Sequence, residues 1–419
     1  MLMSLKKGIY SYNEEIIVSN IKKHLDNLKE FTSTKGYGVT RLPFTKEAKQ
    51  AVSYLENEMK KIGLKTRVDE SGAIIGRLEG KKEKTIIIGS HYDSVSYGGS
   101  FDGIAGIVCG MEVAKLIIEN NIYPEYSLEV IGTNDEEGAR FSSGFFSSKA
   151  MIGELNINLL KSLKDCNDIS IYDAMKDYGL NPENIHYAQR DLNNIRSFLE
   201  IHIEQGPVLE NHRCSIGIVD TIVGMKRGIV TIKGREDHAG TTPMDMRIDA
   251  IEIASKVICK ISDIARKYKD AVATVGYIET MPNAINTIAK EVKFSLDIRS
   301  TNSIVNKKIL SEIIENLNEI TVKHNTIYTF DATLQVEPVH MNKYIRNIIE
   351  ECCNKRKFSY EHIVSGAGHD SLPIGRVIDT GMIFVPSKGG RSHCKDEFTD
   401  YEYLMQAVII ATDVICNTD

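Results

Sequence analysis

The apolar and polar positions of this chain alternate between helical and extended patterns. Apolar residues recur at helical spacing over residues 14–32, 45–62 and 103–121. Short β-branched runs at 84–91 and 379–385 are typical of buried strands in a parallel sheet. Further strands are expected at 64–78, 127–138 and 196–206, and further helices at 341–357 and 400–416. Helices and strands that alternate in this way predict an α/β fold.

The middle of the chain follows a different order. Between residues 214 and 335 the pattern predicts strand, helix, strand, strand, helix, strand, which is the βαββαβ order of ferredoxin-like domains. The expected strands are 225–234, 271–281, 286–300 and 324–335, and the expected helices are 246–267 and 302–321. We therefore predict a domain at 214–331, inserted into a domain formed by 1–213 and 332–419.

Composition and charge exclude some classes of protein. The net charge is −6 with both signs interspersed, so we expect no nucleic-acid partner. No apolar run approaches the roughly 20 residues that cross a bilayer, so we expect no membrane partner. The eight cysteines are scattered without a CxxC pair, and the first residues show no secretory signal. Both features predict a cytoplasmic protein with reduced thiols.

Chemically active side chains follow several of the predicted strands, at the edge where open α/β sheets bind ligands. His91 and Asp93 are two residues apart at one strand end, so their side chains point the same way. The Asp93 carboxylate could then reach the far nitrogen of His91 and fix its tautomer for metal binding. Asp102 follows a glycine-containing loop and starts the next helix, where it is a candidate bridge between two cations.

Two adjacent glutamates end another predicted strand. Successive side chains diverge, so one can bind a cation while the other faces the attacking water; we assign Glu137 to the cation and Glu136 to the water, although spacing alone leaves this open. His202 on a third strand and His393 near the C-terminus complete a ligand set suited to zinc, manganese or cobalt. Each residue alone is more often a solvated group; the combination predicts a metal site.

Longer segments make a resemblance to a known family visible. In order, they are GSHYDSVSYGGSFDGIAG (89–106), NDEEGARF (134–141), HIEQGPVLE (202–210), DHAGTTPMDMRIDA (237–250), PNAIN (282–286), DIRS (297–300), SGAGHDS (365–371) and MIFVPSKGGRSH (382–393). On these segments the chain resembles the amidase/hydantoinase/carbamoylase family of binuclear zinc hydrolases. That family includes N-carbamoyl-L-amino acid hydrolases, allantoate amidohydrolases and β-ureidopropionases, and is a branch of the aminoacylase- and carboxypeptidase-like metallopeptidases.

The resemblance implies a fold and a metal centre. The fold would be a mixed-sheet, metallopeptidase-like catalytic domain with helices on both faces, carrying an inserted ferredoxin-like lid and dimerisation domain. Each subunit would hold two divalent ions, zinc or else manganese or cobalt. The ligands would be His91 and His202 for one ion, Glu137 and His393 for the other, and Asp102 as the bridge. Glu136 would be the catalytic acid and base.

The resemblance also implies substrate-binding positions. They fall on Gln205, His238, Asn286, Arg299 and Gly368, with His369 beside them. Arg299 offers a bidentate fork for a substrate carboxylate, with a surface ion pair as the alternative. His238 could stabilise an oxyanion, and a helix-capping turn is equally compatible with its sequence. The family implies that His238 and Asn286 reach the partner subunit's site, so we expect a homodimer through the inserted domain.

Together these features predict a metal-dependent amidohydrolase. The expected substrate is an N-carbamoyl-L-amino acid, whose ureido C–N bond is cleaved to give the amino acid, carbon dioxide and ammonia. Allantoate amidohydrolase is the alternative, followed by an N-acyl-amino acid or dipeptide hydrolase. A binding protein that has lost the chemistry is disfavoured by the intact ligand set. A purely structural metal site is disfavoured because Glu136 would then be surplus.

Overall fold

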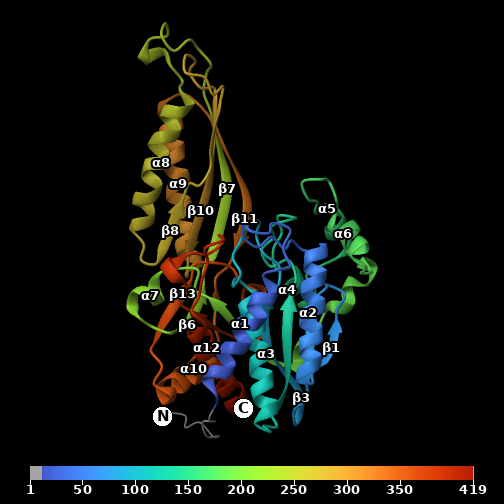
Figure 1. Ribbon diagram of the computed structural model, residues 1–419. Coiled ribbons are helices and arrows are strands. Elements are labelled where there is room, and N and C mark those ends of the chain that lie inside the picture. Colours follow the sequence, from blue (N-terminus) through green and yellow to red (C-terminus); the bar gives the residue numbers. More distant parts are fainter. Residues whose placement is uncertain (1–11, 419) are drawn as a thin grey trace. The chain divides into compact units, whose positions relative to one another are not determined.

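The computed structural model describes residues 12–418; the segment 1–11, where we saw no secretory signal, lies outside them. The chain divides into two compact units, Met1–Asp220 with His340–Asp419, and Thr221–Val339 (Figure 1). Both boundaries lie after those predicted at 213/214 and 331/332. The first boundary is later because the strand beginning at Ile216 pairs within the sheet of the first unit, and the second is later because the strand Tyr328–Val336 pairs within the sheet of the second unit. None of the described helices is long and apolar enough to span a membrane.

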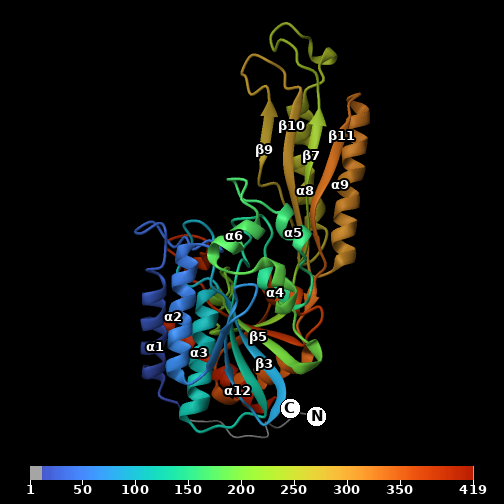
Figure 2. The ribbon, with the colours of Figure 1, turned by 90° about the vertical axis from the view of Figure 1, so that its right-hand side faces the viewer.

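The first unit is built on a mixed sheet of nine strands (Figures 1 and 2). These are β1 (Lys65–Val68), β2 (Ile74–Leu78), β3 (Lys82–His91), β4 (Tyr126–Thr133), β5 (Ile195–Ile203), β6 (Ile216–Ile222), β12 (Val339–His340), β13 (Tyr360–Ser365) and β14 (Thr380–Val385). Their order is β1-β2-β4-β3-β5-β14-β6-β12, with β13 beside β6. The central strands β4, β3, β5 and β14 are parallel, and β1, β2 and β6 pair antiparallel to their neighbours. The strand predicted at 64–78 is thus a hairpin of two strands.

Helices cover both faces of this sheet. One face carries α1 (Glu14–Leu28), α2 (Lys46–Ile62), α3 (Ile104–Glu119), α10 (Lys343–Arg356) and α12 (Tyr401–Asn417). The other carries α4 (Phe146–Met151) and α11 (Ser371–Ile374), and the short helices α5 (Ile157–Ser162), α6 (Ile171–Tyr178) and α7 (Val208–His212) lie in connections. Successive residues of a strand point to opposite faces of the sheet. Ile86 and Ile88 pack in the core beneath α1, α2, α3, α10 and α12, and Ile87 packs in the core beneath α4 and α11. The predicted α/β class is confirmed.

The second unit is an antiparallel sheet with two helices. It comprises β7 (Gly224–Lys233), α8 (Ala250–Arg266), β8 (Ala271–Thr274), β9 (Ile278–Met281), β10 (Glu291–Ser300), α9 (Ser303–Lys323) and β11 (Tyr328–Val336). The strand order is β11-β7-β10-β8, with β9 also paired to β10. Both helices pack on one face, where they bury alternate residues of β10 such as Phe294 and Leu296. The βαββαβ order is present, with the strand expected at 271–281 interrupted to form β8 and β9.

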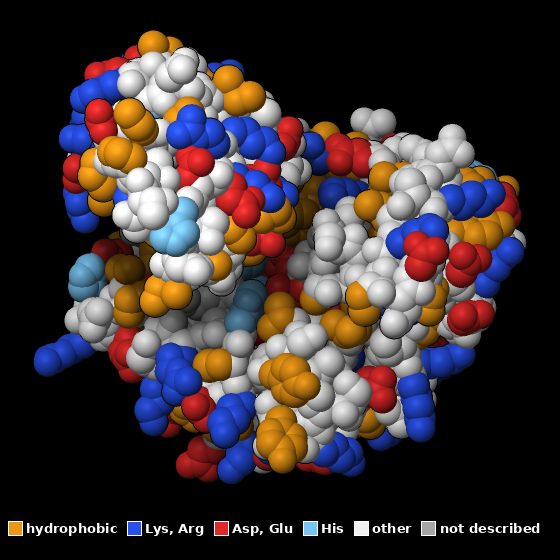
Figure 3. All heavy atoms as spheres, turned by 90° about the horizontal axis from the view of Figure 1, so that it is seen from above, with side chains coloured by type: hydrophobic (Ala, Val, Ile, Leu, Met, Phe, Trp, Pro, Cys, Tyr) orange, Lys and Arg blue, Asp and Glu red, His pale blue; other side chains and the backbone are white. Residues whose placement is uncertain are grey.

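Charged side chains are mixed on the face drawn in Figure 3. Lysine and arginine side chains alternate there with aspartate and glutamate, and the described ones gather in no broad patch of one sign. This distribution agrees with the interspersed charges of the sequence. A continuous basic surface, such as nucleic-acid binding uses, is not seen among the described side chains of this face.

Candidate metal centre

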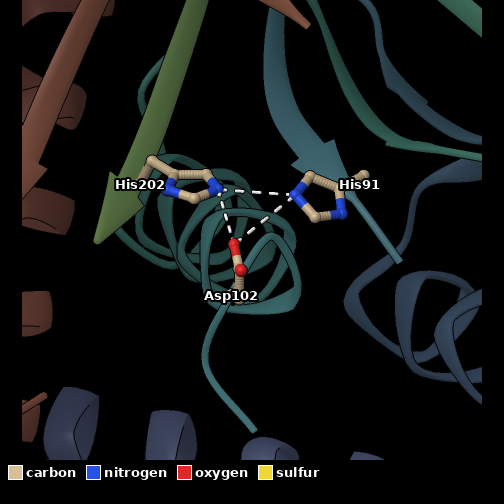
Figure 4. A group of neighbouring side chains, drawn as sticks. All are labelled: His91, Asp102 and His202. Carbon is tan, nitrogen blue, oxygen red and sulfur yellow. Dashed lines mark hydrogen bonds and ion pairs between the residues drawn. The ribbon is translucent and has the colours of Figure 1, made fainter. Parts of the chain in front are cut away.

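Two imidazoles lie at the C-terminal ends of neighbouring parallel strands. His91 ends β3 and His202 lies near the end of β5, and each is only 1% exposed. Their Nε2 atoms are 3.4 Å apart. Both face Asp102, whose Oδ1 lies 3.7 Å from His91 Nε2 and 3.1 Å from His202 Nε2 (Figure 4). The two strand ends and the loop that precedes the helix Ile104–Glu119 therefore bring these three side chains together.

Backbone carbonyls fix the tautomers of the two rings. His91 Nδ1 lies 3.1 Å from the Asp93 carbonyl oxygen, and His202 Nδ1 lies 2.9 Å from that of Ile203. A carbonyl only accepts, so each Nδ1 donates. When the rings bind a cation in their neutral form, Nε2 is therefore the nitrogen that carries the lone pair. Our prediction that the Asp93 carboxylate orients His91 is corrected, because that carboxylate is 3.7 Å from Nδ1 and the carbonyl makes the bond.

The spacing of these atoms fits a divalent cation. Tetrahedral zinc, with Zn–N bonds of about 2.0–2.1 Å, holds its ligand atoms about 3.3 Å apart, close to the 3.4 Å between the two Nε2 atoms. Burial lowers the pKa of His202, but the hydrogen bond and charge of Asp102 outweigh it and raise that pKa to about 9. In the absence of a cation, a proton on His202 therefore compensates Asp102. A cation would replace that proton.

The two glutamates occupy the turn after β4, so the strand predicted to residue 138 ends earlier. The Asp93 carboxylate holds this turn by accepting the backbone N–H groups of Glu136 at 3.1 Å and Glu137 at 3.2 Å. A carboxylate oxygen of each glutamate lies within 4.8 Å of the other and of a His91 ring nitrogen, so the two carboxyl groups do not diverge as expected for successive residues. Their ion-pair distances differ: Glu136 Oε2 lies 3.9 Å from His91 Nε2, and Glu137 Oε1 lies 3.4 Å from His393 Nε2.

Both glutamates lie where a charge is costly. Burial, and then the charge of Glu137, raise the pKa of Glu136 well above its usual range. Burial and the charge of Asp102 raise the pKa of Glu137 to about 10. Such carboxyl groups keep a proton at neutral pH unless a cation stabilises the charged form. A buried carboxyl that can hold and release a proton is suited to general acid–base chemistry.

A second group of possible ligands lies on the other side of Asp102. His393 Nε2 is 3.1 Å from Asp102 Oδ2 and 3.4 Å from Glu137 Oε1. The His393 side chain is 47% exposed, in contrast to the buried histidines of the first group. Burial opposes ionisation of Asp102, but its contacts with His202 and His393 outweigh burial and hold its pKa well below the usual range. The two Asp102 oxygens therefore face two different groups of donors, each compatible with a metal ion.

Three predicted substrate-binding residues lie close to this centre. Gln205 Nε2 donates to Asp102 Oδ2 at 2.9 Å. The buried His369 packs its ring on His202, with centroids 4.4 Å apart, and its Nε2 lies 3.0 Å from Ser365 Oγ. Burial and the nearby charge of His202 lower the pKa of His369 well below its usual value, so its ring is neutral. At Gly368, a Cβ atom would lie 2.7 Å from the Phe145 ring, and only glycine avoids that contact.

The other predicted substrate residues belong to the second unit. His238 and Asn286 lie on neighbouring segments, joined by a hydrogen bond of 3.0 Å from Ala239 N to the Asn286 carbonyl. His238 Nδ1 accepts the N–H groups of Gly240 and Thr241 at 3.0 and 3.2 Å. The helix predicted from 246 begins at 250, and its cap is Asp249. The turn after His238 therefore fixes an imidazole and does not cap the helix.

Arg299 lies at the far end of β10 from those two residues. Its Nε and Nη2 donate to Asp297 at 2.9 and 3.0 Å, so the ion pair that we gave as the alternative is present. Asn286 precedes the start of β10 at Glu291, whereas Arg299 is next to the last residue of this strand. At about 3.4 Å per residue, Glu291 and Arg299 are roughly 27 Å apart along this strand. Within one copy of this unit the predicted substrate residues therefore form two separate groups.

Two residues around the centre had no role in our sequence analysis. Glu397 accepts the backbone N–H of Asp102 at 3.0 Å, and its position four residues after His393 lies outside the segments that carry the resemblance. Arg41 is 2% exposed and donates to the carbonyls of Tyr92 at 2.5 Å and Leu28 at 2.7 Å. Its guanidinium thereby anchors the segment that carries His91. No local pattern marks an arginine for such a buried position.

Comparison with known proteins supports a shared ancestry over nearly the whole chain. A family model described as peptidase family M20/M25/M40 matches residues 87–417. The chain is 38% identical over 398 residues to the N-carbamoyl-L-amino-acid amidohydrolase of Paenarthrobacter aurescens, covering 94% of this chain and 96% of that protein. It is 34% identical to the allantoate amidohydrolase of Bacillus subtilis strain 168, covering 95% and 97%. The solved structure of an amidase of the hydantoinase/carbamoylase family from Burkholderia multivorans superposes with a TM-score of 0.87 at 28% identity, covering 95% and 97%.

Proposed function

This chain belongs to the peptidase family M20/M25/M40, and from that premise we propose that it is a metal-dependent amidohydrolase acting on an N-carbamoyl-L-amino acid. Hydrolysis of the N-carbamoyl amino acid by one water molecule would give the amino acid, carbon dioxide and ammonia. One observation carries the proposal: the two oxygens of the buried Asp102 face two separate sets of ligands, and Glu136 lies beside them. The names of the relatives supply the class of bond.

The proposed cofactor is a pair of divalent cations. His91 and His202 would hold one, Glu137 and His393 would hold the other, and Asp102 would be shared. The mixed nitrogen and oxygen ligands suit zinc, and also manganese or cobalt. Glu137 Oε1 is buried without a hydrogen-bond donor among the described residues, which is the condition that a cation would relieve.

In this proposal Glu136 moves the protons. Bound cations supply positive charge that acidifies the attacking water and polarises the scissile carbonyl. Glu136 takes the proton of the attacking water and delivers it to the leaving nitrogen. Without bound cations, burial and the charge of Glu137 raise the pKa of Glu136 and favour its protonated form. Bound cations would favour the charged carboxylate, which can accept the proton of the water.

Substrate recognition is proposed to involve two subunits. His238 and Asn286 lie beyond the Glu291 end of β10 and Arg299 lies near its other end, so the strand between them spans roughly 27 Å by the rise of an extended chain. One small substrate cannot touch both groups of the same copy. We assign Arg299 to the substrate carboxylate of its own subunit, in competition with Asp297, and His238 to the oxyanion in the site of a partner subunit. A homodimer formed through the second unit is therefore part of the proposal.

The identity of the substrate has a second candidate. The allantoate amidohydrolase of Bacillus subtilis is 34% identical, close to the 38% of the carbamoylase from Paenarthrobacter aurescens. Both substrates carry a ureido group and a carboxylate, so one arginine and one metal centre can serve either. An N-acyl-amino acid or dipeptide is the third candidate, because the family model is that of peptidases.

Ammonia release tests the proposal. Purified protein loaded with zinc, manganese or cobalt is offered N-carbamoyl-L-amino acids, N-carbamoyl-β-alanine and allantoate, and release of amine from N-acyl-amino acids and dipeptides is followed in parallel. We expect ammonia from at least one N-carbamoyl-L-amino acid, with higher kcat/KM than from allantoate. Turnover of allantoate alone would select the second candidate, and amine release without ammonia the third. Absence of every activity in each metal form would refute the proposal.

A further inference from the structure

The carboxylate of Glu397 connects two segments that carry metal ligands. Its Oε1 accepts the backbone N–H groups of Phe101 at 2.9 Å and Asp102 at 3.0 Å. Its Oε2 accepts the hydroxyl of Ser392 at 2.8 Å. Ser392 immediately precedes His393, and its hydroxyl also lies 3.4 Å from Asp102 Oδ2. The buried side chain of Glu397 therefore bonds both to the segment that carries Asp102 and to the segment that carries His393.

The surrounding chain leaves room for Glu397 and for little else. A Cβ atom on Gly99 would overlap the carboxylate of Glu397, so glycine at this position lets the loop close over it. Glu397 itself is 4% exposed. These contacts join residues about three hundred positions apart in the sequence, since the bonds to Phe101 and Asp102 span 296 and 295 residues. Glu397 therefore holds together two segments that the order of the chain keeps far apart.

We propose that Glu397 is a positioning residue for the centre, which holds Asp102 so that its two carboxylate oxygens face two different cations. This inference rests on the proposed function, because it presupposes that cations bind there. The physical basis is the fixed backbone of Asp102. With its N–H held, the short side chain has few rotamers left, and Oδ1 and Oδ2 stay directed at the two groups of ligands.

The structure offers a matched control. Asp69 is also buried, and it also accepts two backbone N–H groups, from Ser71 at 2.9 Å and Ala73 at 3.1 Å, and one hydroxyl, from Ser71 at 2.7 Å. Glu397 and Asp69 thus make the same kinds of bond, but Asp69 contacts no proposed ligand. Loss of either carboxylate costs similar local bonding. Only loss of Glu397 should change the metal centre.

The test uses Mn²⁺ as the probe and the full chain freed of metal. Calorimetric titration gives the affinity and number of bound ions, and electron paramagnetic resonance shows whether two ions are coupled through a shared carboxylate. For Glu397→Ala we expect at least about tenfold weaker binding of the second ion and loss of the coupled spectrum. For Asp69→Ala we expect a lower melting temperature with both readouts unchanged.

Milder variants separate position from charge and from folding. Ser392→Ala removes the bond to Oε2 together with the longer contacts of this hydroxyl with Asp102 and Gln205, and it should weaken binding of the second ion by a few-fold in a protein that folds. Glu397→Gln keeps an oxygen for the two N–H groups, so we expect affinities within about threefold of wild type and a coupled spectrum. If Glu397→Gln weakens Mn²⁺ binding as much as Glu397→Ala does, the carboxylate acts through its charge and the positioning role is overturned.

Two different failures can be told apart. If the wild-type protein binds two coupled Mn²⁺ ions and Glu397→Ala does so with unchanged affinity, the inference about Glu397 is wrong while the proposed function stands. If the wild-type protein binds no Mn²⁺, Zn²⁺ or Co²⁺, the proposed function itself fails. Loss of metal by Asp69→Ala to the same extent as by Glu397→Ala would also overturn the inference, because general destabilisation would then explain both.

Discussion

The two halves of the candidate metal centre are built differently. On one side of Asp102, His91 and His202 are 1% exposed, extend from the ends of adjacent central strands, and have their far nitrogens on backbone carbonyls. On the other side, the His393 side chain is 47% exposed and belongs to a loop, with its backbone in the left-handed region at φ 55°. The first half is fixed by the sheet, and the second is completed by a loop.

This difference separates two ways of positioning a ligand. A residue at the end of a buried parallel strand inherits its place from the hydrogen bonds of the sheet, and it stays in place without a metal. A loop ligand depends on side-chain contacts such as those of Glu397, and on left-handed backbone conformations that a non-glycine residue adopts at a cost of about 1–3 kcal/mol. We therefore expect the buried half to matter for folding and the exposed half to matter for the affinity of the second ion.

The largest expected effect separates the two adjacent glutamates, which lie toward different halves. Glu136→Gln should lower turnover by about a thousandfold or more with unchanged metal content, because the general acid and base is lost. Glu137→Gln should instead lose metal from the half that contains His393. Ammonia release and elemental analysis on both variants check this. Near wild-type turnover in Glu136→Gln would contradict the mechanism.

The next effect compares one histidine from each half. In the metal-free protein, His202→Ala should lower the free energy of unfolding by about 3 kcal/mol, because it removes the buried ion-pair partner of Asp102 Oδ1. His393→Ala should cost less than about 1 kcal/mol, because its side chain is half exposed. Urea unfolding of both variants provides the measurement. Equal losses would show that burial does not distinguish the two halves.

His24 is a buried imidazole outside the centre, and it shows what burial does to a histidine pKa where no carboxylate outweighs it. Burial lowers the pKa of His24 to about 4, whereas Asp102 raises that of His202 to about 9. Because the unfolded chain takes up a proton near pH 6.5 and folded His24 does not, stability falls as pH drops from 6.5 toward 4. We expect His24 to account for about 2 kcal/mol of this loss. Urea unfolding of His24→Gln between about pH 7.5 and 4.5 should show a correspondingly smaller decrease.

The control for that experiment is an exposed histidine. His186→Gln makes the same substitution at an exposed position, so it separates the effect of burial from the effect of replacing a histidine. If His24→Gln and wild type lose equal stability over this range, the imidazole of His24 is not held neutral in the fold. Burial would then not be what sets the pKa of His24.

The smallest effect concerns a group outside both halves. Arg299→Lys should raise KM about tenfold with a smaller change in kcat, because lysine lacks the bidentate fork that suits a carboxylate. Arg227→Lys is the matched control, since Arg227 contacts the same Asp297 at 2.7 Å. Steady-state kinetics on an accepted ureido substrate distinguish them. An equal rise of KM in both variants would indicate a general disturbance of β10 and not a lost substrate contact.

The sequence predicts those elements whose apolar periodicity and cap residues match the residues that are buried in the structure. The helix predicted at 45–62 is observed at Lys46–Ile62, between the cap residue Thr45 and the left-handed Gly63. The segment 139–194 was not assigned. Its helices are only six to eight residues long, and they are stabilised by packing in a separate cluster around Phe141 and Phe146. Such short helices depend on tertiary contacts, which no local pattern reveals.

In the candidate site, too, local periodicity predicted some features, and others depend on tertiary contacts. Strand periodicity placed His91 and His202 at one edge of the sheet, and the structure brings them together with Asp102. Periodicity gives the direction of a side chain but not which oxygen bonds to it, so the role of the Asp93 carboxylate was wrong. The link from Glu397 to Asp102 joins the N-terminal and C-terminal segments of the first unit, and spacing along the chain could not predict it.

Anomalous X-ray diffraction from crystals of the zinc-loaded protein tests the central claim most directly. The claim is that the two oxygens of Asp102 face two cations, one held by His91 and His202 and one by Glu137 and His393. Two zinc peaks with the Asp102 carboxylate between them would support it. A single peak, or two peaks of which only one is within bonding distance of Asp102, would contradict it.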